Sequence, residues 1–213
     1  MSTAICIANK AQDIFDKIRT SIDFIGPLLL RIYIVPVFWV ASNNKWNPFD
    51  SDSSLESVIQ WFGNTEWGLG LPFPTLMAYM AWGTEYFGAI LLALGLATRW
   101  ISIPLMFTMI VAAVTVHWQN GWQAVHDLAS PYASANAGEA IERLSRAKDL
   151  LKEHGNYDWL TEYGNLIASN NGIEWATTYF LILLALFVTG GGKFVSVDYW
   201  LAKKFKGQPC GLA

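Results

Sequence analysis

The apolar positions of this chain gather into four long stretches that are separated by polar connectors. Each stretch approaches the roughly 20 residues that a helix needs to cross a bilayer. Helices are the expected form, because backbone groups in lipid must find their hydrogen-bond partners within the segment. The sequence therefore predicts an all-α polytopic membrane protein, a single domain over 1–213 built as a four-helix transmembrane bundle, with spans at about 27–46, 74–97, 100–118 and 173–189.

Two further regions repeat apolar residues at helical spacing without being apolar throughout. Residues 9–23 place one face of isoleucine and phenylalanine opposite charged residues, which is typical of a helix lying in the membrane interface. The polar insert 119–172 has a similar pattern over 137–153, and a shorter helix is expected over 157–168. We expect this insert to lie outside the membrane as a helical cap.

The connector between the first two spans also contains a helix signal. Ser53-Ser54-Leu55-Glu56 fits a capping box, in which a serine hydroxyl and a glutamate carboxylate bond to backbone N–H groups of the first turn. This pattern predicts a short helix over 54–62.

Composition agrees with a membrane protein and excludes some other classes. Charged residues make up 15% of the chain, against about 25% in an average soluble domain. Eleven tryptophans are typical of a protein with two membrane–water interfaces, where an apolar ring with a polar N–H is favoured. The net charge of −3 without any basic run argues against a nucleic-acid partner.

The distribution of Lys and Arg near the span ends predicts the orientation. Most of them, Arg99 and Lys193 included, lie on the side of both termini, whereas only Lys45 lies close to a span on the opposite side. By the positive-inside rule, both termini are expected in the cytoplasm and the insert outside it. The segment before the first span is long and balanced in charge, so we interpret that span as retained rather than as a signal peptide.

Three ionisable residues interrupt the expected spans: Arg31, Glu85 and His117. A charged group in hydrocarbon costs several kcal/mol unless it faces a partner or a cavity. At about 1.5 Å of rise per residue, Arg31 lies roughly 6–10 Å and Glu85 roughly 16 Å above the cytoplasmic boundary, so we expect the two side chains to meet. They either lock two helices together or frame a small redox or anionic ligand, with Tyr86 beside them.

Lys45, His117 and Glu174 all fall at the outer ends of spans, at similar depth. They are expected to surround one outer mouth, where an imidazole passes protons near neutral pH. The alternative is that His117 is an interfacial residue beside Trp118. No metal site is expected, because the three histidines have neither i,i+4 spacing nor a thiolate nearby.

No NAD, flavin, haem or iron–sulfur motif is recognisable in the sequence. Any redox chemistry must then use a lipid-soluble carrier such as a quinone, or the cofactor of a partner.

Taken together, several short motifs resemble the DoxX family of bacterial four-helix membrane proteins. The first span has Arg31 and Lys45, and the third ends in His117. The second span has Glu85-Tyr86-Phe87-Gly88 and then a Gly-Leu-Ala-Thr-Arg turn, and a glycine run leading to Ser196-Val197-Asp198 follows the fourth. Val35 and Ser42 stand where the family has glycines, and the insert is larger than in the family core.

The resemblance implies membrane redox chemistry, because the family includes the membrane part of a thiosulfate:quinone oxidoreductase and members linked to sulfur or metal stress. We expect a quinone-linked redox subunit of the bacterial inner membrane, able to form oligomers. Glu85 and His117 are then the expected catalytic residues, and Arg31, Lys45 and Tyr86 join them in binding the ligand. Two alternatives stay open: a non-enzymatic anchor that recruits a periplasmic redox or metal-handling partner through 119–172, and a small transporter.

Overall fold

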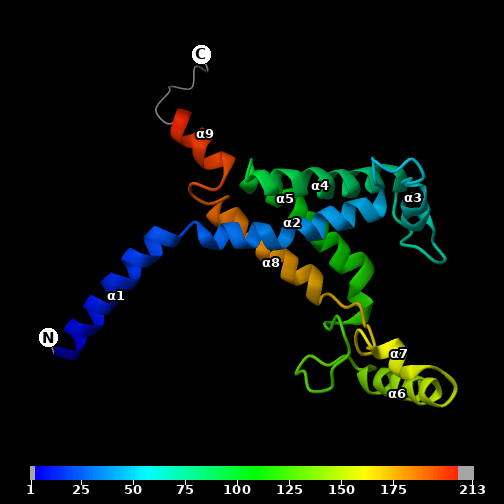
Figure 1. Cartoon of the computed structure of the whole chain (residues 1–213). Coiled ribbons are helices and arrows are strands. Elements are labelled where there is room, and N and C mark those ends of the chain that lie inside the picture. The colour runs from blue at the N-terminus through cyan, green and yellow to red at the C-terminus, as the bar shows by residue number, and fades with distance from the viewer. Residues whose placement is uncertain (1–2, 206–213) are drawn as a thin grey trace. The chain divides into compact units, whose positions relative to one another are not determined.

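The computed structural model describes residues 3–205, and their regular secondary structure is helical (Figure 1). The one β pairing within this range is an isolated bridge between Val125 and Ser169. The all-α prediction is therefore confirmed for the described part of the chain.

Four helices correspond to the four apolar stretches: α2 (Ile25–Lys45), α4 (Pro74–Leu94), α5 (Thr98–Ala112) and α8 (Glu174–Thr189). A π-helical turn, Ala113–His117, and a 3-10 turn, Trp118–Asn120, continue α5. The polar regions contain α1 (Thr3–Ile22), α3 (Glu56–Gly63), α6 (Ala137–His154), α7 (Tyr157–Thr161) and α9 (Val197–Phe205).

Three local predictions differ from the structure. The capping box does not form, because Leu55 takes the N-cap position of α3 and makes no side-chain capping bond. Ser53 instead accepts a hydrogen bond from the backbone N–H of Asn47 at 2.9 Å. The helix expected over 157–168 ends at Thr161, and the tail after the glycine run contains α9, which the sequence pattern did not predict.

The chain divides into two compact units, and the boundaries between them fall within α5 and α8. The first, here called the core unit, is Met1–Thr108 together with Leu181–Ala213. The second, the insert unit, is Met109–Phe180. A single domain over the whole chain, with the four spans in one bundle, stays a prediction.

In the core unit α2 packs lengthwise against α4 (Figure 1). Both helices turn small or apolar residues toward this contact, because burying apolar surface and close packing favour it. Gly88 shows that α4 also approaches α5 closely, since a Cβ atom there would lie 2.9 Å from a methyl group of Leu105 on α5. The buried apolar side chains of this unit include Ile34, Phe38, Leu92, Leu105, Leu183 and Leu186.

A second, smaller core lies where α3 packs against α4. It consists of buried Leu55, Phe62 and Ala78, with Trp46 and Trp82 against it. This cluster lies close to the end of α2, because Trp46, the residue after Lys45, packs against it.

Two helical segments in the described chain have both the length and the hydropathy needed to cross a membrane, Ile25–Lys45 and Thr98–Asn120. α4 has 21 residues, so it has the length of a span, whereas α8 is apolar but has 16 residues. The prediction of a helical membrane protein is therefore supported by two candidate spans, and the four-span topology belongs to the proposals below.

Candidate functional site

The buried carboxylate of Glu85 pairs with Lys45. The Lys45 Nζ donates to Glu85 Oε2 at 2.6 Å, and it also lies 3.4 Å from the carbonyl oxygen of Ala41, one turn earlier on α2. The side chain of Glu85 is 5% exposed and that of Lys45 23% exposed. Lys45 therefore turns back from the end of its helix into the α2–α4 contact, which brings a proton donor and a proton acceptor together.

Four aromatic rings form what we call the aromatic stack: Trp39 of α2, Tyr86 and Trp82 of α4, and Trp46, the residue after α2. Tyr86 is stacked on Trp39, with ring centroids 5.4 Å apart, and on Trp82, with centroids 5.2 Å apart. Trp82 contacts Trp46 at 4.5 Å and donates its indole N–H to the Trp46 carbonyl at 2.8 Å. Such offset ring pairs each add stability beyond their buried area.

The ion pair and the stack lie on the same part of α4, because Trp82 and Glu85 are three residues apart and are therefore neighbours on one helix face. Lys45 precedes Trp46, and Glu85 precedes Tyr86. Trp39 ends the stack and is 39% exposed, so part of its ring surface is open to a ligand. The site thus offers a cationic donor, a carboxylate and an aromatic surface, a combination suited to a planar ring that carries oxygen acceptors.

Arg31 does not face Glu85, so the predicted pairing of these two residues is wrong. Its guanidinium donates to four backbone carbonyl oxygens: Leu92 at 2.6 Å, Ala93 at 2.7 Å, Gly191 at 2.8 Å and Val195 at 3.1 Å. Four of its five N–H groups are thereby occupied. Arg31 holds the end of α4 and the loop after α8 against α2, and little of its hydrogen-bonding capacity is left for a ligand.

Asp198 and the turn between α4 and α5 lie next to Arg31 and are joined by hydrogen bonds. Asp198 accepts hydrogen bonds from the backbone N–H groups of Ala97 and Thr98, at 2.7 and 2.9 Å. Its own N–H donates to the carbonyl of Gly95 at 3.0 Å. Asp198 therefore caps the start of α5 and ties α9 to the turn, so these residues have a structural role.

His117 lies in the insert unit, where its Nδ1 is 2.8 Å from the carbonyl oxygen of Asn171. In the same unit the carboxylate of Glu174 accepts a hydrogen bond from the N–H of Ala124 at 2.9 Å. Lys45 belongs to the core unit and pairs with Glu85. An outer mouth formed by Lys45, His117 and Glu174 stays a prediction, as does a catalytic role for His117.

Within residues 3–205 no group of three or more His, Cys, Asp or Glu side chains is arranged to hold a metal ion. A small cavity of about 230 Å³ lies in the core unit, lined by Leu28, Arg31, Ile32, Val35, Pro36 and Ala93. Ile32, Val35 and Trp39 share one face of α2 by their spacing of three and four residues. This apolar face therefore runs from the cavity toward the exposed end of the aromatic stack.

The sequence analysis predicted Lys45, Glu85 and Tyr86 as ligand-binding residues but did not pair Lys45 with Glu85. It also gave Trp39 and Trp82 no place in the site. Their spacing held a usable signal: Trp82, Glu85 and Tyr86 recur at i, i+3 and i+4 and share one face of α4.

Comparison with known proteins agrees with the motif resemblance. Residues 26–118 match the family model described as DoxX. The chain is 36% identical over 92 residues to a Bacillus subtilis (strain 168) protein named "Putative oxidoreductase CatD". This match covers 43% of the present chain and 60% of the relative, so the chain spans about three fifths of the relative's length. No solved structure matches. The helices that hold Arg31, Lys45, Glu85 and the aromatic stack thus fall within residues 26–118, the part of the chain that is similar to DoxX, a family of membrane proteins.

Proposed function

We propose that this protein is the membrane subunit of a quinone-linked oxidoreductase and that the Lys45–Glu85 pair binds the quinone head group. The observation that carries the proposal is this ion pair beside an aromatic stack, inside a chain that is otherwise poor in charge. An ion pair that serves stability alone is often replaceable by apolar residues without loss. The name of the Bacillus subtilis relative adds support for redox chemistry.

In this proposal each residue of the site has a separate role in binding or protonating the quinone. The Lys45 ammonium donates a hydrogen bond to a carbonyl oxygen of the head group, and the open surface of Trp39 packs against its ring. Glu85 exchanges protons with the same oxygen and is reloaded from water at the end of α2. When bound, the quinone supplies an acceptor for two electrons and two protons. We assign the source of the electrons to a partner oxidoreductase, because the sequence has no recognisable NAD, flavin, haem or iron–sulfur motif.

The apolar cavity on α2 suits the lipid-soluble part of such a ligand. It is lined by Leu28, Ile32 and Val35 besides Arg31, and it shares a helix face with Trp39. We place the protein in the bacterial inner membrane, with four spans and both termini in the cytoplasm, in sulfur or metal and oxidative-stress metabolism. These features follow the family resemblance and the Lys and Arg distribution.

The test is quinone binding and reduction by the full chain in nanodiscs, with ubiquinone-1 as the probe. Titration calorimetry measures binding, and quinone reduction is measured in membranes that contain the partner. Lys45→Met should weaken binding about tenfold, the loss expected for one charge-assisted hydrogen bond. Glu85→Gln keeps a polar group of the same shape and should lower reduction more than binding. Glu142→Gln, on the exposed surface of α6, is the matched control.

Wild-type protein that fails to bind ubiquinone-1 would refute the proposal. So would unchanged binding and reduction in both Lys45→Met and Glu85→Gln, measured at a temperature at which circular dichroism shows each variant to be folded.

The organisation of the insert favours a second candidate, a membrane anchor for a periplasmic redox or metal-handling partner. The insert unit forms a compact body of its own. Large aromatic side chains stand exposed on it, among them Tyr132, Trp159 and Tyr163. Exposed aromatic residues are enriched where proteins bind each other. If this is the function, replacing 119–172 by a short linker abolishes the phenotype, whereas Lys45→Met leaves it intact.

A further inference from the structure

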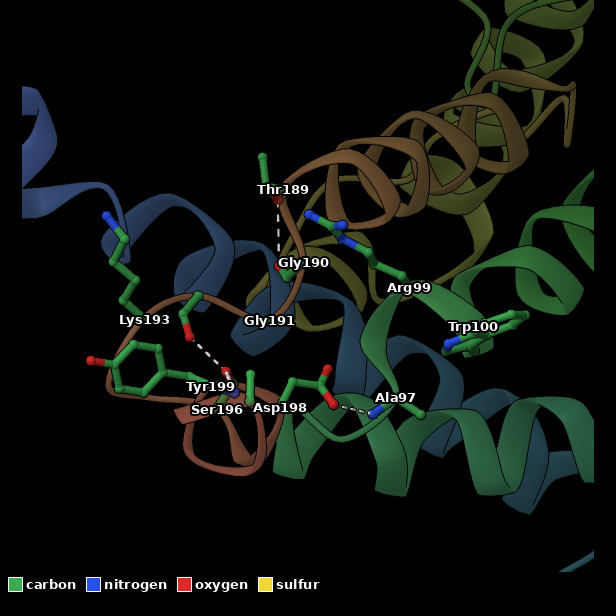
Figure 2. A pocket seen from close by; sticks show the side chains of 12 residues that line it. Ala97, Arg99, Trp100, Thr189, Gly190, Gly191, Lys193, Ser196, Asp198 and Tyr199 are labelled. Atoms are coloured by element: carbon green, nitrogen blue, oxygen red, sulfur yellow. Dashed lines mark hydrogen bonds between the residues drawn. The ribbon is translucent and has the colours of Figure 1, made fainter. Parts of the chain in front are cut away.

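A second cavity, larger than the one on α2, lies away from the ion pair, at the turn between α4 and α5. It measures about 400 Å³ and belongs wholly to the core unit. Residues from the start of α5, the end of α8 and the loop into α9 form its walls (Figure 2). Those that matter here are Arg99, Trp100, Thr189, Gly190, Lys193 and Asp198.

Arg99 is the cation of this cavity with the most free donors. Its side chain extends from the start of α5 toward Thr189 and Gly190 (Figure 2). One hydrogen bond engages it, from Nη2 to the carbonyl of Val188 at 3.1 Å. A guanidinium has five N–H groups, and within residues 3–205 Arg99 has no acidic partner. Several donors and a full positive charge are thus open to a ligand.

The other charged groups in the wall are already paired. Both carboxylate oxygens of Asp198 accept backbone N–H groups of the α5 turn, so this acid faces the turn (Figure 2). Lys193 forms an ion pair with Asp23. The charge that remains for a ligand is therefore positive.

The position of the cavity indicates what kind of anion it meets. Arg99 and Trp100 open the apolar segment Thr98–Asn120, which is long enough to cross a membrane. Trp100 is 75% exposed, and tryptophan and arginine at a span end are typical of the head-group layer. Gly190 and Gly192, with φ of +79° and +91°, keep one wall free of side chains, so that a ligand can reach the backbone.

We infer that this cavity binds a phosphate group through Arg99, and that the phosphate belongs to an anionic phospholipid of the surrounding leaflet. Arginine suits this ligand because its planar fork matches two phosphate oxygens at once. Free inorganic phosphate has the same binding chemistry, so the experiment must separate the two sources. The inference does not depend on quinone binding, because none of the residues of the ion pair or the stack lines this cavity.

The test is native mass spectrometry of the full chain released from nanodiscs of phosphatidylcholine with one fifth phosphatidylglycerol. Wild-type protein should retain phosphatidylglycerol in preference to phosphatidylcholine. Arg99→Gln should reduce that retention about fivefold, the factor that corresponds to about 1 kcal/mol per basic residue at an anionic surface. Thr189→Glu keeps Arg99 but places a carboxylate at the rim of the cavity, toward which Arg99 extends. This variant should reduce the retention of phosphatidylglycerol as Arg99→Gln does. Arg143→Gln, on the exposed surface of α6, should retain the lipid as wild type does.

A parallel arm measures the unfolding temperature in detergent with added sodium phosphate. One outcome is that phosphate stabilises the wild type but not Arg99→Gln, while no phosphatidylglycerol is retained. This result would support phosphate binding by Arg99 and would overturn the assignment of the phosphate to a lipid. Equal retention of both lipids by the wild type, without stabilisation by phosphate, would overturn the inference. Equal phosphatidylglycerol retention by wild type, Arg99→Gln and Thr189→Glu would overturn it as well.

Discussion

Gly95 ends α4 in the left-handed region, with φ of +63°, and it lies directly against the Arg31 guanidinium. A Cβ atom at this position would be 2.6 Å from the Cβ of Ser196 and 2.7 Å from the Cζ of Arg31. Real Cβ atoms do not approach so closely, so Gly95→Ala must displace Arg31, Ser196 or the turn itself. The left-handed conformation costs alanine about 1 kcal/mol, and overpacking costs about 1–3 kcal/mol. We expect Gly95→Ala to lower the free energy of unfolding by about 2–4 kcal/mol.

The matched control is Gly83→Ala on the same helix. A Cβ atom at Gly83 would meet nothing within 4 Å, and alanine is the better helix former by about 0.8–1.0 kcal/mol. The two variants should therefore move in opposite directions in reversible SDS unfolding from mixed micelles, followed by circular dichroism. Wild-type stability of Gly95→Ala, with Gly83→Ala folded as expected, would refute the role given to Arg31 and its carbonyl partners.

Three further outcomes follow from the same contacts. Asp198→Ala leaves two N–H groups of the α5 turn without their acceptor and should lower the free energy of unfolding by about 2–3 kcal/mol. Asp198→Asn keeps one acceptor and should cost about half of that. SDS unfolding compares the two variants, and equal losses would contradict the capping role. The buried hydroxyl of Thr98 has no partner in the described chain, so Thr98→Val should raise stability by about 1 kcal/mol, and a large loss in thermal unfolding would reveal an overlooked partner. Lys45→Met leaves the Glu85 carboxylate buried without its cation and should cost about 3 kcal/mol, and the double variant with Glu85→Leu should recover most of it; a double variant as unstable as Lys45→Met would contradict the assigned pairing.

The family motif residues fall into two groups with different roles. Arg31, Gly95 and Asp198 meet at one turn, where their contacts are almost all with backbone groups. Lys45 and Glu85 pair with each other beside aromatic rings. The first group fixes the architecture, and the second supplies the proton donor and acceptor of the proposed quinone site. Substitutions in the first group should therefore act through stability, and those in the second should act on function even in a folded protein.

The sequence by itself determined the helices, because hydrophobic periodicity and length are local properties of the chain. The four apolar stretches match α2, α4, the α5 segment and α8 closely, and the insert helix 137–153 is matched by α6. Weaker local signals predicted the structure less accurately. The capping box did not form, and the sequence pattern did not predict α9. The titratable residues Arg31, Lys45, Glu85 and His117 were also evident from composition, since charges inside apolar stretches are rare.

The tertiary structure alone decided which of these residues meet. Helical rise gave the depth of Arg31 and Glu85 but not the direction in which each side chain turns. The loop over 190–196 brings free carbonyl oxygens to Arg31 from about 160 positions away in the chain, and no local pattern encodes such a contact. With Arg31 satisfied there, the buried carboxylate of Glu85 needs another cation, and the flexible stem of Lys45 is long enough to turn back along α2 and supply it.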